Sequence, residues 1–169
     1  MFRELLYMKY AWIFYALLLS GCGVYSLTGA HIGGKTIQIP SLENRAPNVN
    51  PTLATTLENK IRSRILSQTG LTSVNTENAD YELKAVITGY SVSVTGAQSN
   101  NMASQNRLTI TLQVDFVNKL DEKASFKSSF NRFEDFKANQ QLQSVEDGLI
   151  EKIGNDLADD IFNKAFVNW

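Results

Sequence analysis

Four consecutive residues near the start of the chain, Leu19, Ser20, Gly21 and Cys22, have the order of a lipobox, the recognition sequence for cysteine lipidation. The signal peptidase that cuts before the cysteine needs small side chains there, because bulk would keep the backbone out of its active site. The thiol is the only one in the chain. It would carry a diacylglycerol through a thioether, and the new amino terminus would carry a third acyl chain. The chemistry predicted at Cys22 is therefore covalent lipid attachment, with no other cofactor.

The residues before the lipobox have the order of a secretory signal. Positive charges at Arg3 and Lys9 precede an apolar run over residues 10–19, and small residues follow it. At about 1.5 Å per residue this run would span about 15 Å, roughly half of a bilayer core. A transmembrane anchor that began earlier would be interrupted by Lys9. We therefore expect residues 1–21 to be a lipoprotein signal peptide and Cys22 to begin the mature chain.

The residue after the cysteine indicates the destination. In the best-known sorting rules an acidic residue there retains a lipoprotein at the inner membrane, whereas this chain has Gly23. No acidic cluster follows the cysteine, which removes one known signal for display on the cell surface. Two or more acyl chains hold a protein firmly, since each buried methylene contributes about 0.8 kcal/mol. We expect an outer-membrane lipoprotein anchored in the leaflet that faces the periplasm.

The composition gives no support to a nucleic-acid partner or to catalysis. The net charge is −1, and a hydrophobic content of 43 % is ordinary for a globular protein. With Cys22 modified, no thiol remains for a disulfide, a nucleophile or a metal site. The one histidine, His31, cannot build a histidine-based metal motif alone. Adjacent acidic pairs at residues 134–135 and 159–160 point apart on a strand or helix. We predict a non-enzymatic protein without catalytic or metal-binding residues.

Hydrophobic periodicity predicts one short strand and one helix in the first half of the domain. Residues 35–40 alternate and read as a strand. Asn50 is the predicted N-cap of the helix, Pro51 its first residue and Gly70 its stop. Its apolar face consists of Leu53, Leu57, Ile61 and Ile65.

Three strands are predicted next. In residues 81–95 the apolar positions change from odd to even numbers at Gly89, which predicts a β-bulge. Residues 108–116 alternate regularly, and a turn leads to a third strand with Phe126 and Phe130 facing inward. Consecutive strands joined by short loops are expected to pair as an antiparallel meander with one face exposed to solvent.

A long helix is predicted at the end of the chain, with Ser144 and Asp147 as a capping box. Its apolar stripe consists of Ile150, Ile153, Leu157, Ile161 and Ala165. Two amphipathic helices and an amphipathic sheet bury their apolar surfaces when both helices cover the same sheet face. We predict an α+β fold of order β-α-β-β-β-α. It is a two-layer sandwich whose antiparallel sheet of about four strands is mixed at the first strand. The predicted organisation is a signal peptide (1–21), a lipidated tether (22–34) and a single domain (35–169).

The polar face of the predicted sheet is the first candidate binding surface. It carries Lys84, Arg107, Lys123 and Lys127 among hydroxyl and amide side chains. An ordinary solvated face is one interpretation. The other is an anionic or amphiphilic ligand, or a protein wall, against the face, with Arg107, Lys123 and Lys127 as ligand-binding candidates.

The second candidate is the uncharged loop over residues 96–105, which contains Asn100, Asn101 and Met102. A solvated hairpin tip is one interpretation of this loop. The alternative is a partner interface in a narrow space, where unpaired charges would cost several kcal/mol to desolvate, about 2–7 for even a neutral polar group.

Short motifs along the mature chain resemble those of the LptE family of lipopolysaccharide-assembly lipoproteins. They are CGVYSLTGA at residues 22–30, TIQI at 36–39, NRAP at 44–47, and NPTL at 50–53 heading a helix. The resemblance implies an α+β sandwich seated inside the large outer-membrane β-barrel LptD, which places lipopolysaccharide in the outer leaflet. It also implies that the lipoprotein helps the barrel assemble and contacts the glycolipid through basic residues. The three basic candidates above come from the strand pattern alone.

A periplasmic regulator lipoprotein that binds cell-wall synthases or secretion machinery is the competing interpretation. Such regulators usually have a long linker after the cysteine. Here the first strand begins about a dozen residues after Cys22, a reach of about 40 Å at most. A domain held so close to its membrane favours a membrane-embedded partner.

Replacing Cys22 by Ser should leave an unprocessed precursor without acyl chains, because only the thiol is lipidated. Mass spectrometry of the membrane fraction measures this. Mature wild-type protein with an unmodified Cys22 would contradict the predicted anchoring.

Overall fold

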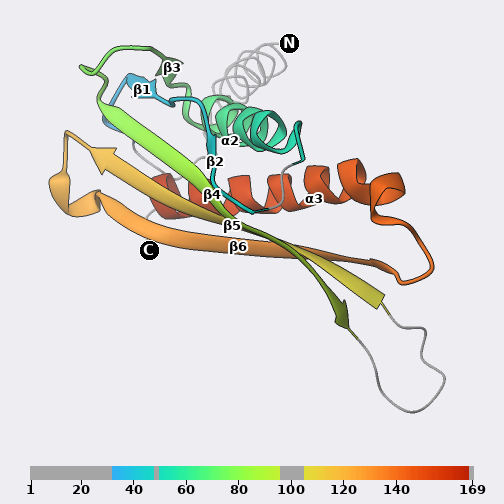
Figure 1. The fold of residues 1–169 in the computed structure, drawn as a ribbon. Helices are drawn as coiled ribbons and strands as arrows, with labels where there is room; N and C mark the ends of the chain where they lie inside the picture. Colours follow the sequence, from blue (N-terminus) through green and yellow to red (C-terminus); the bar gives the residue numbers. More distant parts are fainter. Residues whose placement is uncertain (1–31, 48–49, 96–104, 168–169) are drawn as a thin grey trace, which may run out of the picture.

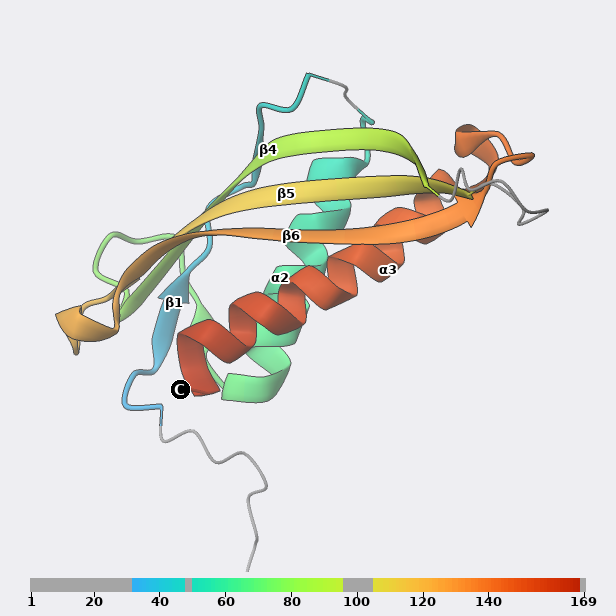
Figure 2. The ribbon, with the colours of Figure 1, turned by 90° about the horizontal axis from the view of Figure 1, so that it is seen from below.

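The computed structural model describes residues 32–47, 50–95 and 105–167. Cys22 and the loop residues Asn100, Asn101 and Met102 therefore lie outside the described residues. The described part is a mixed β-sheet with two α-helices packed against one face (Figures 1 and 2). The predicted α+β sandwich is confirmed, but the sheet has six strands rather than about four.

The elements follow one another in a simple order. They are β1 (Thr36–Gln38), β2 (Glu43–Asn44), α2 (Leu53–Thr69), β3 (Thr72–Ser73), β4 (Tyr81–Thr95), β5 (Gln105–Asn118), η1 (Glu122–Ala124), β6 (Phe126–Lys137), α3 (Leu142–Phe162) and the π-helical turn η2 (Asn163–Val167). The strand order is β3-β1-β4-β5-β6, and β2 also pairs with β4. The pairs made by β1, β2 and β3 are parallel, whereas β4, β5 and β6 form an antiparallel meander.

The predicted bulge in β4 is confirmed. Ile87 pairs with Leu112 and Gly89 with Thr111, so Thr88 has no partner on β5. A side chain at residue 89 would not fit readily, because its Cβ would lie 3.1 Å from Thr111 Oγ1. The extra residue returns Tyr90 to the helix-covered face, where it is 6 % exposed and hydrogen-bonded to Glu146 of α3.

Helix α2 has the predicted buried face and the predicted end. Gly70 adopts a left-handed conformation with φ 68° and donates its N–H to Leu66 O, as glycine stops commonly do. The predicted start is wrong by two residues, since Leu53 is the first helical residue and Thr52 the N-cap. The Asn50 carboxamide oxygen accepts hydrogen bonds from Thr52 N and Oγ1 at 2.9 and 2.7 Å. Asn50 therefore forms a turn before the helix rather than capping it.

Helix α3 starts at Leu142, so the predicted capping box is also wrong. Ser144 Oγ donates to Gln141 O at 2.7 Å instead of accepting from the backbone. The apolar stripe is confirmed, with Ile150, Ile153, Leu157 and Ile161 at most 1 % exposed. The two helices touch at Gly154, where an added Cβ would lie 3.1 Å from Leu57 Cδ2.

The start of the described chain is fixed beside β4 by one carboxylate. Asp80 Oδ2 accepts hydrogen bonds from Lys35 N, Thr36 N and Thr36 Oγ1 at 2.8, 3.0 and 2.9 Å. The hydrogen bond from Lys35 N is the main cause that lowers the pKa of Asp80 below its usual value. The carboxylate thus joins the first strand to the beginning of β4.

Asp80→Asn should lower the melting temperature at neutral pH, because the neutral amide accepts these hydrogen bonds less strongly. A depressed folded-state pKa stabilises above the unfolded pKa of about 3.9, and this contribution is lost as pH falls through the lower folded value. The difference between wild type and variant should therefore shrink below about pH 4. Thermal melts between pH 7 and 2.5 measure it, and a constant difference would contradict the assignment.

Leu157→Asp should unfold the domain, since residue 157 is 0 % exposed between the helices and the sheet. A buried unpaired carboxylate costs several kcal/mol against a total stability of about 5–15 kcal/mol. Asn155→Asp is the matched control on an exposed position of the same helix. Circular dichroism melts compare the two. A native melt for Leu157→Asp would show that this helix face is not buried.

Candidate functional site

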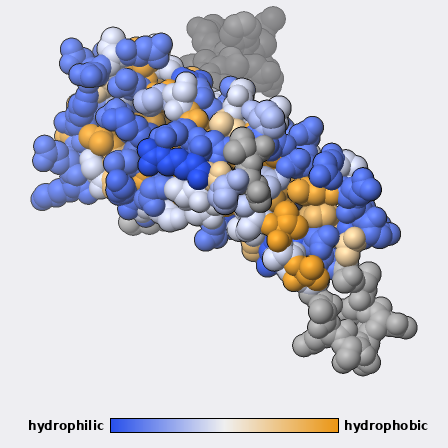
Figure 3. Space-filling model, in the orientation of Figure 1, coloured by the Kyte–Doolittle hydropathy of each residue, from blue (hydrophilic) through white to orange (hydrophobic). Residues whose placement is uncertain are grey.

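The stem of the β4–β5 hairpin exposes apolar side chains. The ends of β4 and β5 project from the body of the domain (Figure 1). Val92 and Val94, on the helix-facing side of β4, are 45 % and 69 % exposed. Figure 3 shows hydrophobic surface where the hairpin leaves the body. Residues 96–104 join the two strands and lie outside the described residues, so the predicted interface at residues 100–102 remains a prediction.

Arg107, the first ligand candidate, is already paired. Its Nε and Nη2 donate to the Asp135 carboxylate at 2.7 and 2.9 Å, and its guanidinium carbon lies 3.6 Å from the centre of the Phe133 ring. The hydrogen bond from Arg107 lowers the pKa of Asp135, and the same bond raises the pKa of Arg107. This side chain presents a compensated charge beside an aromatic ring that is 47 % exposed.

Lys123 and Lys127 lie far from Arg107. On β5, Asp115 pairs with Lys127 and Arg107 with Asp135, so the two ion pairs are eight residues apart. That separation corresponds to about 27 Å. Lys127 Nζ lies 3.7 Å from an Asp115 oxygen, and both side chains are exposed. The structure therefore does not bring the three candidates together into one site.

Lys123 instead shares an open depression of about 530 Å³ with Lys164, which sequence reasoning missed. The Lys164 ammonium donates to Ser128 Oγ at 2.6 Å and lies 4.9 Å from the centre of the Phe126 ring. Phe130 completes an aromatic floor beneath it. The depression holds these two cations beside an aromatic surface, and its one carboxylate, Asp160, is bonded to Arg132. No sequence pattern could find this pair, because it depends on where η2 lies over β6.

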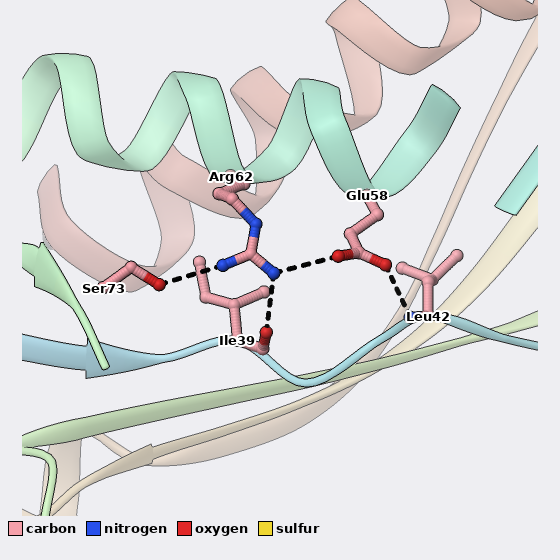
Figure 4. A network of polar contacts seen from close by, with 5 residues as sticks. All are labelled: Ile39, Leu42, Glu58, Arg62 and Ser73. Atoms are coloured by element: carbon pink, nitrogen blue, oxygen red, sulfur yellow. Dashed lines mark hydrogen bonds and ion pairs between the residues drawn. The ribbon is translucent and has the colours of Figure 1, made fainter. Parts of the chain in front are cut away.

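A polar cluster around Arg62 and Glu58 joins α2 to the sheet (Figure 4). Arg62 donates to Ser73 Oγ, Ile39 O and Glu58 Oε1 at 2.9, 2.8 and 2.9 Å. Glu58 Oε2 accepts from Leu42 N at 3.2 Å. Every contact is internal, so this cluster holds the strand edge on the helix and leaves little capacity for a ligand.

The described residues contain neither a metal cluster nor a membrane-crossing helix. No group of three His, Cys, Asp or Glu side chains within ranges 32–47, 50–95 and 105–167 could hold a metal ion. No helix in those ranges is long and apolar enough to cross a membrane. His31 lies outside them.

Comparison with known proteins gives a family and a fold. The LptE family profile, described as lipopolysaccharide-assembly, matches residues 34–165. No curated protein matches the chain.

Several solved structures share the fold. A minor lipoprotein of Acinetobacter baumannii is 16 % identical with a TM-score of 0.53, over 79 % of this chain and 93 % of that one. A Xanthomonas campestris protein is 11 % identical with a TM-score of 0.55, over 82 % and 86 %. Uncharacterised lipoprotein B of Nitrosomonas europaea is 13 % identical with a TM-score of 0.50, over 78 % and 81 %. At these identities the likeness concerns the fold alone.

Proposed function

Because the chain belongs to the LptE family of lipopolysaccharide-assembly proteins, we propose that it is the plug and assembly partner of an LptD-type outer-membrane β-barrel. In this proposal the domain is anchored through acyl chains on Cys22 to the periplasmic leaflet of the outer membrane. The domain plugs the barrel with its hairpin end in the lumen, catalyses no reaction, and supports the insertion of lipopolysaccharide into the outer leaflet.

The observation that carries the proposal is that the hairpin of this family domain contains no charged side chain. Residues 85–106 contain no charged side chain, although the chain as a whole is 20 % charged. Barrel lumens are confined, so an uncharged segment enters without leaving charges unpaired. The projecting stem is the part of the domain that can lead such an insertion (Figure 1).

The position of the anchor supports the same arrangement. The described chain begins at Ile32, ten residues after Cys22, a reach of about 35 Å at most. The start of the described chain lies beside Tyr81, where Gly34 N donates to the Tyr81 hydroxyl. Tyr81 is at the end of β4 opposite the hairpin. The two ends of β4 are about 48 Å apart. The tether therefore joins the domain at the end of β4 that is far from the hairpin, which leaves the hairpin free to enter a barrel.

Basic residues near the anchored end are the candidates for glycolipid contact. Lys123 and Lys127 stay in the proposal, and Lys164 joins them because it shares the aromatic depression with Lys123. Arg107 is a weaker candidate, since its guanidinium is held by Asp135.

Affinity purification of the tagged chain from detergent-solubilised outer membrane tests the proposal. A β-barrel protein of large mass should co-purify in equal amount. Asn100→Asp combined with Met102→Asp should reduce that recovery several-fold, because two carboxylates would lose water in the lumen. Asn75→Asp combined with Asn78→Asp is the matched control, since it adds the same charges in the exposed loop before β4.

Recovery of cell-wall synthases or secretion components instead of a barrel would contradict the proposal and support the regulator interpretation. Equal recovery for both double variants would contradict the role of the hairpin. Thermal melts of both variants should match wild type, so that loss of fold does not explain a lost complex.

A further inference from the structure

One edge of β4 is left open along the hairpin stem. Its pairing with the N-terminal strands ends at Ile87, which accepts a hydrogen bond from Arg45 N at 2.9 Å. Beyond Ile87, the described residues show no backbone hydrogen bond to that side of the strand. Residues 91–94 are all exposed. We call residues 91–95 the distal edge of β4; Figure 2 shows them along the border of the sheet.

The distal edge of β4 differs from the other long edge of the sheet, which is β6. Natural sheets protect free edges with charged side chains, because an unprotected edge pairs with other strands. The charged residues of β6 are Lys127, Arg132, Glu134, Asp135 and Lys137. The distal edge reads Ser-Val-Ser-Val-Thr, with no charge and no proline. Val92 and Val94 are 45 % and 69 % exposed. Their alternation with hydroxyl side chains favours pairing with another strand.

We propose that the distal edge of β4 accepts an extended strand from the barrel partner by β-strand addition. This inference rests on the proposed function and specifies how the partner is held. The added strand should be uncharged, with apolar side chains beside Val92 and Val94 and small polar ones on the other face. Main-chain hydrogen bonds would supply the attachment, and the alternation would set the register.

A second copy of the chain is the less suitable occupant. Stable interfaces bury about 1,200–2,000 Å², far more than two paired five-residue strands provide. A partner that already surrounds the hairpin presents its strand at a high effective concentration, so a short pairing is enough. The partner of the proposed function therefore fits the size of this edge.

Residue-resolved hydrogen–deuterium exchange tests the inference on the purified complex and on the full chain alone in detergent. Successive residues of a strand direct their backbone groups to opposite neighbours. In the chain alone, alternate amides of residues 91–95 should exchange fast and the others slowly through their bonds to β5. In the complex the fast amides should slow by about tenfold or more, while the β6 edge stays unchanged.

A complex without this alternating protection would overturn the strand addition and leave the proposed function standing. Failure of the wild-type chain to bring down a barrel would overturn both. Concentration-dependent protection of the same amides in the chain alone would assign the edge to a second copy and also overturn the proposal. Val94→Lys should reduce the protection in the complex, whereas Asn131→Lys on the charged β6 edge should not.

Discussion

The antiparallel pairing of β4 with β5 is the contact on which the rest of the structure depends. It runs over fourteen partnered positions and includes the bulge at Thr88. Both strands present their apolar side chains to the same two helices, so the register of this one pair decides what is buried. If the same residues formed a regular strand without the bulge, Tyr90 would face the other side of the sheet and its contact with Glu146 of α3 would be lost. Burial and that contact both raise the pKa of Tyr90.

The register of β5 with β6 determines the charge pattern of the outer sheet face. Arg107 lies opposite Asp135, and Asp115 lies opposite Lys127, so opposite charges occupy facing positions on β5 and β6. Exposed pairs of this kind contribute little to stability. Their consequence is a face that is nearly neutral as well as polar, which suits contact with a polar wall better than binding one strongly charged ligand. The depression that contains Lys123 and Lys164 lies at the other end of the sheet and is lined by two lysines and one carboxylate, Asp160.

The sequence predicts a structural feature correctly where a local pattern is compatible with only one structure. The change of apolar phase at Gly89 predicts a bulge, because side chains alternate with a period of two. The N-cap predictions at Asn50 and Ser144 were wrong, since such side chains bond equally well to turns just outside or inside a helix. Two-residue strands such as β2 and β3 are too short to alternate, and they exist because distant partners hold them. Arg62 is one of these partners, and no spacing rule connects it to Ser73.

In the proposed complex, the hairpin stem rather than the opposite end of the domain lies against an outer-membrane barrel. Photo-crosslinking in cells with a probe amino acid at Val94, and in parallel at Asn75 before β4, tests this claim most directly. Val94 is 69 % exposed, so replacing its side chain by the probe should not disturb the fold. We predict capture of one large β-barrel protein from residue 94 and markedly less from residue 75. Capture of the barrel from residue 75 alone, or of soluble periplasmic enzymes from residue 94, would contradict the account.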